Sequence, residues 1–354
     1  MSFPKIIIIA SIILFGGIAG ISFFKAKKPH KEVAFDTKKS KIQEINLNEA
    51  AALPKSKPNA VKENDQTEKK DLIVKNDIKN DVVVKEDNQV QEEQKDLEIP
   101  DADIIDRLFV TDSTKLPIVE TVNYTSRVPW LKGRNAWIAD YASHYSTTRH
   151  FIARSLNKKT DYFTQKVAFG DRFNVFSTEK NISFYLLIDI NRCKLWFYYL
   201  DNDLNERTLL KTYKVGLGRK DSNRISTSLT PIGKYALGSK VAIYKPNIMG
   251  YFLDKKIEMI KVFGTRWIPF DKELENCSET AKGLGIHGAP WHEGLNGELV
   301  EDRSQVGKYD SDGCVRLFSE DIDELFSIII SKPTVVEIVK DFHEAKLPGV
   351  EKKY

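Results

Sequence analysis

Cysteine is scarce in this 354-residue chain, which contains only Cys193, Cys277 and Cys314. Three cysteines are too few for the disulfide framework of a small secreted domain. A single pair between Cys193 and Cys277 stays open, and it would leave Cys314 free. No cysteine precedes Cys193, which excludes a lipid-modified N-terminal cysteine.

An excess of one charge is also missing, because 54 Lys and Arg against 50 Asp and Glu leave a net charge of only +4. This balance gives no indication of a nucleic-acid partner. The one glycine-rich candidate for a dinucleotide loop is Gly216-Leu217-Gly218. No helix pattern follows it and no βαβ unit surrounds it, so it is a very weak signal. We expect no cofactor and no metal.

A long apolar run occurs only at the beginning of the chain, where residues 6–24 carry no charge. Nineteen residues at ~1.5 Å each roughly match a hydrocarbon core of about 30 Å. Residues 1–29 are therefore predicted to be a membrane anchor or an uncleaved signal sequence. A cleavable signal is the alternative, although its small-residue site at 17–19 would fall inside the apolar run.

Apolar surface is low from residue 30 to about residue 115. Segments such as 62–71 and 86–95 are highly charged and have no aromatic residue. They offer too little hydrophobic burial to offset the entropy lost on ordering. We interpret 30–115 as a disordered charged linker that lets the rest of the protein reach away from the membrane.

The composition changes at residues 116–178 to that of a small folded module. Periodicity predicts a strand at 118–124, a helix at 137–145, a helix at 151–156 and a strand at 171–176. This order, with Phe169-Gly170-Asp171 near its end, resembles a LysM module. The resemblance implies binding to glycans such as peptidoglycan, and a generic small α+β domain is the alternative.

Strand patterns dominate residues 181–340. Alternating and continuous apolar runs separated by turns predict antiparallel hairpins from Ser183 to Gly216. One helix is expected from Ser319 to Pro333, because Ile322, Leu325, Phe326 and Ile329 share a face, and a strand follows at 334–339. Residues 341–354 are left as a C-terminal tail.

The residues with the strongest chemical signal are Cys314, in Ser311-Asp312-Gly313-Cys314-Val315-Arg316, and His287, in His287-Gly288. A thiolate is a nucleophile, and a nearby imidazole can take its proton. Gly313 lets a carbonyl approach and lets backbone N–H groups face an oxyanion. A carbonyl at Gly288 could hold the imidazole Nδ1–H and fix its tautomer.

These two motifs, together with Thr230-Pro231-Ile232-Gly233-Lys234-Tyr235, resemble the signature of the L,D-transpeptidases, whose catalytic domain is of the YkuD type. The resemblance covers residues 181–340. It implies a mainly β catalytic domain, a YkuD-like β-sandwich with one or two helices. This chain departs from the pattern at Asp312, where many members have His, and in a longer span from His287 to Ser311.

The resemblance implies acyl transfer on peptidoglycan. Cys314, served by His287, would attack the third residue of a stem peptide, expel D-Ala, and pass the acyl group to an amine of a second stem. An L,D-carboxypeptidase uses water as the acceptor instead, and a non-catalytic wall-binding protein is a further alternative. A cysteine peptidase of another class would require a partner for the histidine that no motif here supplies.

Several neighbours of the two catalytic candidates have expected roles of their own. Ser311 is expected to orient the turn or the oxyanion region, with Gly313 and Gly288. The remaining candidates, for contact with substrate, are Arg316, Trp291 and Asp312. Arg316 could equally hold the domain together through a carboxylate, and Asp312 could simply form the turn.

The expected location is the bacterial cell envelope, with the catalytic domain outside the membrane. The lysines at 25–31 outnumber the one lysine before the apolar run. Taken alone, this charge distribution predicts that the part of the protein after the apolar run lies in the cytoplasm. Long domains translocate largely regardless of such charges, so the functional expectation takes precedence. The loop between Trp291 and Tyr309 is hypothesised to be a lid, and the oligomeric state stays open.

Overall fold

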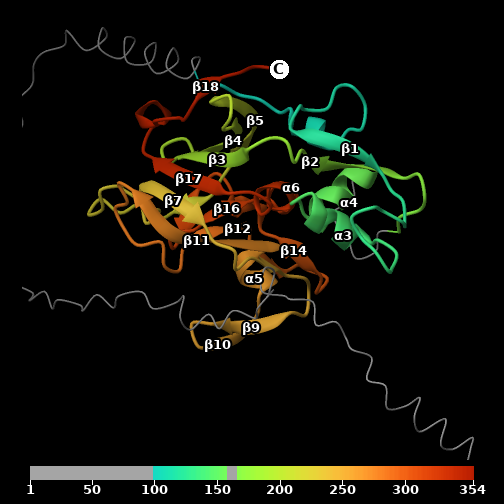
Figure 1. The fold of residues 1–354 in the computed structure, drawn as a ribbon. Coiled ribbons are helices and arrows are strands. Elements are labelled where there is room, and N and C mark those ends of the chain that lie inside the picture. Colours follow the sequence, from blue (N-terminus) through green and yellow to red (C-terminus); the bar gives the residue numbers. More distant parts are fainter. Residues whose placement is uncertain (1–98, 158–165) are drawn as a thin grey trace, which may run out of the picture. The chain divides into compact units, whose positions relative to one another are not determined.

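The computed structural model describes residues 99–157 and 166–354 (Figure 1). The predicted membrane segment and most of the predicted linker lie outside these residues. Among the helices that are described, none is long and apolar enough to cross a membrane.

The first described part of the chain forms a small α+β unit. Its order of strand, helix, helix, strand is the order that the periodicity predicts. Its elements are η3 (Ile105–Leu108), β1 (Val119–Asn123), α3 (Ile138–His144), α4 (Arg149–Asn157) and β2 (Arg172–Phe176). β1 and β2 pair antiparallel, with Val119 opposite Phe176.

Residues 99–115 are folded, which corrects the predicted end of the linker at residue 115. Ile105, Leu108 and Phe109 are buried in the same hydrophobic cluster as the central strands. The Ile104 N–H donates to the Leu210 carbonyl at 2.8 Å. The three apolar side chains supply the burial that the charged part of the linker lacks, so this end of the segment is ordered.

Strands dominate the rest of the chain. The strands of the hairpin region and central sheet are β3 (Ile182–Asp189), β4 (Lys194–Asp201), β5 (Glu206–Lys214), β7 (Gly233–Leu237), β8 (Ala242–Ile243), β11 (Arg266–Glu275), β12 (Gly285–Gly288), β16 (Val315–Leu317), β17 (Thr334–Val339) and β18 (Val350–Glu351). Among the described residues these ten strands form one sheet, in the order β16-β12-β11-β7-β17-β3-β4-β5-β18, with β8 paired to β11.

The antiparallel hairpins β3-β4-β5 are confirmed by their pairing. β17 adds to β3 in parallel, so β3 is a central strand. Six of its eight residues in a row, from Phe184 to Asp189, are buried, as expected when both faces of a strand are covered. The predicted mainly β catalytic domain is confirmed, but its strands form one continuous curled sheet where two stacked sheets were expected.

Helix α6 (Ser319–Ile329) covers one face of this sheet and buries Ile322, Leu325, Phe326 and Ile329. The preceding α+β unit packs on α6, because the Thr148 hydroxyl donates to the Ser327 carbonyl at 3.0 Å and the two units share one hydrophobic cluster. The LysM assignment of the preceding unit stays a prediction.

The segment expected to be a C-terminal tail also belongs to the sheet. Within it, η5 (Phe342–Glu344) packs on the outer face, where the Phe342 ring lies 4.8 Å from Trp196. β18 then pairs in parallel with β5. Residues 341–354 therefore close the far edge of the sheet.

Short elements surround the other edge, near β12 and β16. These are β6 (Leu217–Gly218), β9 (Met249–Phe252), β10 (Lys255–Glu258), α5 (Ile260–Phe263), β13 (Trp291–Glu293), β14 (Leu299–Glu301), η4 (Arg303–Gln305) and β15 (Tyr309–Ser311). The pairs β9-β10 and β13-β14 are antiparallel hairpins, and β6-β15 is parallel. The predicted loop between Trp291 and Tyr309 is thus a hairpin followed by a single 3₁₀ turn.

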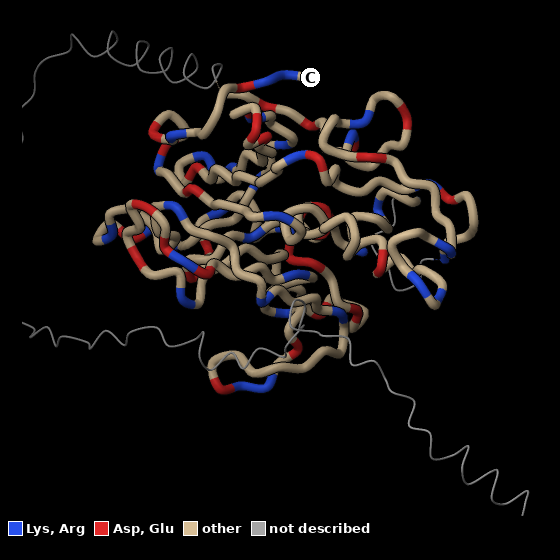
Figure 2. Tube along the Cα trace, in the orientation of Figure 1, with Lys and Arg blue, Asp and Glu red and all other residues tan. Residues whose placement is uncertain are grey.

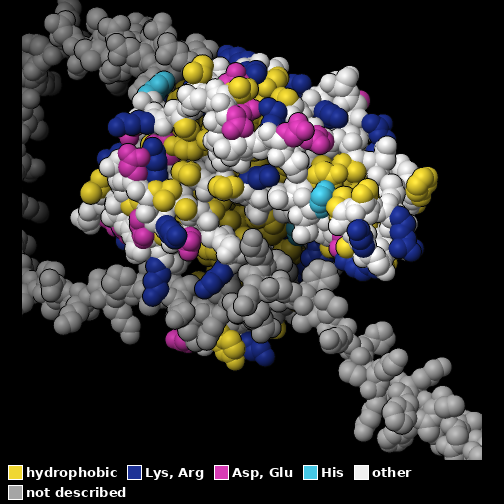
Figure 3. All heavy atoms as spheres, in the orientation of Figure 1, with side chains coloured by type: hydrophobic (Ala, Val, Ile, Leu, Met, Phe, Trp, Pro, Cys, Tyr) yellow, Lys and Arg dark blue, Asp and Glu magenta, His cyan; other side chains and the backbone are white. Residues whose placement is uncertain are grey.

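Acidic and basic residues are interspersed along the folded trace (Figure 2). The β9-β10 hairpin, at the bottom of Figure 1, exposes hydrophobic side chains beside lysines, also visible at the bottom of Figure 3. Its exposed large hydrophobic residues are Met249, Tyr251 and Leu253. Its opposite face, with Phe252 and Ile257, packs on the cluster that also contacts Cys314.

Candidate active site

The strands β12 and β16 bring His287 and Cys314 together. They pair in parallel, with Ile286 opposite Val315 and His287 opposite Arg316. Cys314 directly precedes β16 and packs against the cluster that contains Phe263 and Trp267, the two rings that also contact His287.

The His287 ring is held in one orientation. Its Nδ1 lies 2.7 Å from the Gly288 carbonyl oxygen, which only accepts hydrogen bonds, so Nδ1 carries the proton and Nε2 keeps its lone pair. The rings of Phe263 and Trp267 pack against it at 5.3 and 5.8 Å. The structure therefore contains the Gly288 contact that the sequence predicts, and this tautomer suits a base.

Burial sets the charge of His287. The side chain is almost fully buried, and this burial together with the positive charge of Arg316 lowers the pKa of His287 to about 3. The carbonyls of Gly288 and Phe263 oppose the change. Desolvation disfavours the charged imidazolium, so the imidazole is neutral at physiological pH.

The Cys314 thiol is also neutral at rest. Burial raises its pKa to about 11, against the opposing effects of the Gly285 N–H and of the Arg316 charge. Its Sγ lies 3.8 Å from the Gly283 carbonyl, and the residue keeps partial exposure. A neutral thiol beside a neutral imidazole favours proton transfer to Nε2 during attack over a preformed ion pair.

The turn that presents Cys314 is fastened by Ser311. The Ser311 hydroxyl accepts a hydrogen bond from the Gly313 N–H at 3.1 Å and donates one to the Cys314 carbonyl at 2.6 Å. The Gly313 N–H is thus used inside the turn, which differs from the expectation that it faces an oxyanion. The Cys314 N–H takes no part in these bonds.

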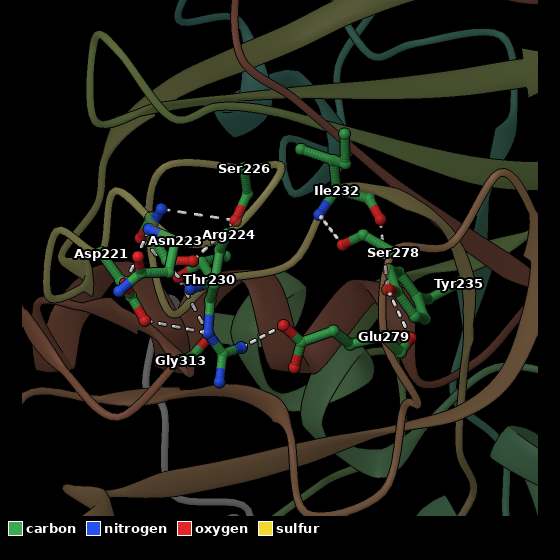
Figure 4. A network of polar contacts seen from close by, with 11 residues as sticks. Asp221, Asn223, Arg224, Ser226, Thr230, Ile232, Tyr235, Ser278, Glu279 and Gly313 are labelled. Atoms are coloured by element: carbon green, nitrogen blue, oxygen red, sulfur yellow. Dashed lines mark hydrogen bonds and ion pairs between the residues drawn. The ribbon is translucent and has the colours of Figure 1, made fainter. Parts of the chain in front are cut away.

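Residues 228–235 lie against this turn (Figure 4). The Thr230 hydroxyl donates to the Gly313 carbonyl at 3.1 Å and accepts from the Gly218 N–H at 2.7 Å. On its other side the segment is held by Ser278, whose Oγ accepts from the Ile232 N–H at 3.1 Å. The motif from Thr230 to Tyr235 therefore supports the turn that carries Cys314.

The match to known families agrees with this geometry. Residues 183–338 match the family model YkuD, described as the L,D-transpeptidase catalytic domain. This segment is a YkuD domain. Among curated proteins, none matches the chain.

Solved structures similar to the chain include the helical cell shape determining protein Pgp2 of Campylobacter jejuni, with 16% identity and a TM-score of 0.31 over 48% of this chain and 50% of that one. Bd1075 of Bdellovibrio bacteriovorus shares 16% identity, with a TM-score of 0.32 over 47% and 50%. L,D-transpeptidase 1 of Mycobacterium tuberculosis shares 15%, with a TM-score of 0.22 over 48% and 68%. The chain spans about half the length of the first two.

The three residues of the YkuD domain that were predicted to contact substrate have different partners in the structure. Arg316 donates to the Gln305 side chain at 2.5 Å, which fits a structural role, while its charge still acts on both catalytic candidates. Asp312 is exposed and forms an ion pair with Arg219 at 2.5 Å. The Trp291 indole donates to the Ser319 hydroxyl at 3.3 Å and packs on the aromatic cluster.

Three features of the site in the YkuD domain were not anticipated. The backbone of Gly283 and Gly285 surrounds the thiol, Phe263 packs on the imidazole, and Thr230 bonds to the catalytic turn. Thr230 lay in a motif that the sequence singled out, but its bond to this turn was not predicted. All three cysteines are free, so the Cys193–Cys277 pair left open by the sequence is not formed.

Proposed function

We propose that this protein is a peptidoglycan L,D-transpeptidase that uses Cys314 as its nucleophile and His287 as its base. The YkuD domain at residues 183–338 supports the substrate class. The observation that carries the proposal is that Cys314 and His287 both contact the cluster of Phe263 and Trp267, with the His287 Nδ1 directed to the Gly288 carbonyl so that Nε2 can act as the acceptor.

The reaction begins as the Cys314 Sγ attacks the carbonyl carbon of the third stem residue while its proton passes to His287 Nε2. The oxyanion faces the Cys314 N–H, and a donor of this kind contributes about 2.7–4 kcal/mol in comparable sites. The C–N bond to D-Ala then breaks, and the imidazolium protonates the leaving amine. A side-chain amine of a second stem attacks the thioester, the cross-link forms and the thiol is regenerated.

Incubation of the full chain with a disaccharide-tetrapeptide tests this function by intact mass spectrometry. We expect a covalent adduct with loss of D-Ala in the wild type and none in Cys314→Ala. An adduct on Cys314→Ala would refute the assignment of the nucleophile. With a second stem present, a cross-linked dimer identifies the transpeptidase, whereas tripeptide alone identifies the L,D-carboxypeptidase.

We also propose that the protein acts in the cell envelope, held to the membrane by residues 6–24 with the YkuD domain outside. The apolar length of that segment supports this location, and so does the substrate class. Protease added to intact spheroplasts should digest the YkuD domain. Protection of the domain until the membrane is lysed would place it in the cytoplasm instead.

A further inference from the structure

The Cys314 N–H and the Gly313 carbonyl belong to one peptide group. Because that group is planar and trans, its N–H and C=O point in opposite directions. Whatever holds the Gly313 carbonyl therefore also fixes the direction of the Cys314 N–H. In this structure the carbonyl is held by the Thr230 hydroxyl at 3.1 Å.

The Thr230 hydroxyl has little freedom to do anything else. It is fully buried, and its oxygen accepts from the Gly218 N–H at 2.7 Å. A hydroxyl has a single proton, and with an acceptor position taken by Gly218 that proton is directed to the Gly313 carbonyl. Gly218 lies in β6, which pairs with β15 just before the catalytic turn, so the whole arrangement is part of the scaffold.

The backbone is closely packed at both glycines of this arrangement. A Cβ added to Gly313 would lie 2.8 Å from the Leu229 carbonyl, and one added to Gly218 would lie 2.4 Å from the Thr230 nitrogen. Ser311 fastens the two neighbouring groups of the turn, the Gly313 N–H and the Cys314 carbonyl. Thr230 alone, in this set of contacts, holds the central peptide.

We infer that Thr230 is a positioning residue for acyl transfer, whose hydroxyl aims the Cys314 N–H at the oxyanion of the tetrahedral intermediate. The inference rests on the proposed function, in which Cys314 accepts an acyl group. Thr230 itself does not touch the reacting atoms. The Thr230 hydroxyl should therefore speed only the reactions of Cys314 that form an oxyanion. It should not change the general reactivity of the thiol.

Two reactions of the same thiol separate these roles. Acetylation by p-nitrophenyl acetate forms the Sγ–C bond through a tetrahedral oxyanion and expels p-nitrophenolate. Alkylation by iodoacetamide forms an Sγ–C bond as iodide leaves, with no oxyanion. Both rates are measured on the full chain by mass spectrometry of the peptide that carries Cys314, because Cys277 is also partly exposed.

Thr230→Val removes the hydroxyl and keeps the side-chain volume. We expect it to slow acetylation by about 10–100-fold, since loss of a whole oxyanion donor costs about 10²–10³, and to leave alkylation within about twofold. Thr230→Ser keeps the hydroxyl and should restore acetylation. The matched control is Thr212→Val, because the Thr212 hydroxyl oxygen is buried without a hydrogen-bond partner in the described part of the chain.

An unchanged ratio of acetylation to alkylation in Thr230→Val would overturn the inference, and so would an equal fall in both rates, which would mark a general structural role. Should Thr230→Val fail to fold, the ratio of acetylation to alkylation is measured on Thr230→Ala instead. Acetate esters react with any accessible thiolate, so this test does not depend on peptidoglycan. A wild type that reacts with the ester but forms no adduct with the disaccharide-tetrapeptide would refute the proposed function alone.

Discussion

The resting charges of Cys314 and His287 determine how the thiol should respond to pH. With a Cys314 pKa of about 11, the thiolate is about 10⁻⁴ of the thiol at pH 7, whereas an unperturbed cysteine of pKa about 8.5 is roughly 3% thiolate. A more basic thiolate is also more nucleophilic, with a Brønsted coefficient of about 0.4–0.5. The two effects together make alkylation of Cys314 at pH 7 about 20-fold slower than that of a free cysteine.

The assay follows iodoacetamide alkylation of the Cys314 peptide between pH 5 and 10, with circular dichroism to confirm that the protein stays folded. We expect the rate to rise about a thousandfold from pH 7 to pH 10 without a plateau, because the pKa lies above this range. The same protein unfolded in urea should gain only about 30-fold, since its thiol titrates near pH 8.5.

The variant His287→Asn provides the second arm of the experiment. A neutral imidazole adds no charge to the site, so this substitution should leave the shape of the alkylation profile unchanged. A plateau that begins below pH 7 in the wild type and disappears in His287→Asn would show a preformed thiolate–imidazolium pair. That result would refute the argument that burial keeps both groups neutral.

Three other predictions follow from the same contacts. Arg316→Gln removes a charge that lowers the Cys314 pKa, so alkylation at pH 8 should fall several-fold, and an unchanged rate would show that the charge does not reach the thiol. The buried His287 has a pKa of about 3 when folded and about 6.5 when unfolded. Its contribution to stability is therefore present above pH 6.5 and is lost as the pH falls, by about 2 kcal/mol between pH 7 and pH 5. Urea unfolding of the wild type and of His287→Asn at both pH values measures this loss of unfolding free energy. The loss should be smaller in the variant. Gly313 has φ +119°, and a Cβ there would lie 2.8 Å from the Leu229 carbonyl, so Gly313→Ala should lower the free energy of unfolding by about 2–4 kcal/mol from strain and contact. Gly297→Ala, where φ is +76° and the space is open, should lose only about 1 kcal/mol.

The short motifs of the sequence anticipated several local contacts of the candidate site. His287-Gly288 and Ser311 to Arg316 contain local information, because the Gly288 carbonyl bonds to the adjacent imidazole and Ser311 bonds within its own turn. Contacts between residues one to three apart depend on residue type and turn geometry. They could therefore be anticipated without knowing the rest of the fold.

The strands of the hairpin region were equally accessible from sequence. Their apolar runs and turn residues are local signals, and β3, β4 and β5 pair in the expected order. The sequence did not predict that residues 99–115 fold against the central sheet, because Ile105, Leu108 and Phe109 are only three apolar residues in a charged region. Their burial depends on a cluster contributed by strands about a hundred positions later.

The sequence by itself determined which residue types were available for the chemistry, a lone thiol beside glycine and an imidazole followed by glycine, since those patterns are local. Tertiary structure decided their protonation states, through burial and the Arg316 charge. It also decided that Gly313 bonds to Thr230, 83 positions earlier in the chain. Such contacts arise only when β6, β12, β15 and β16 meet at one edge of the fold, because hydrogen bonding and desolvation depend on distances in space that sequence separation does not fix.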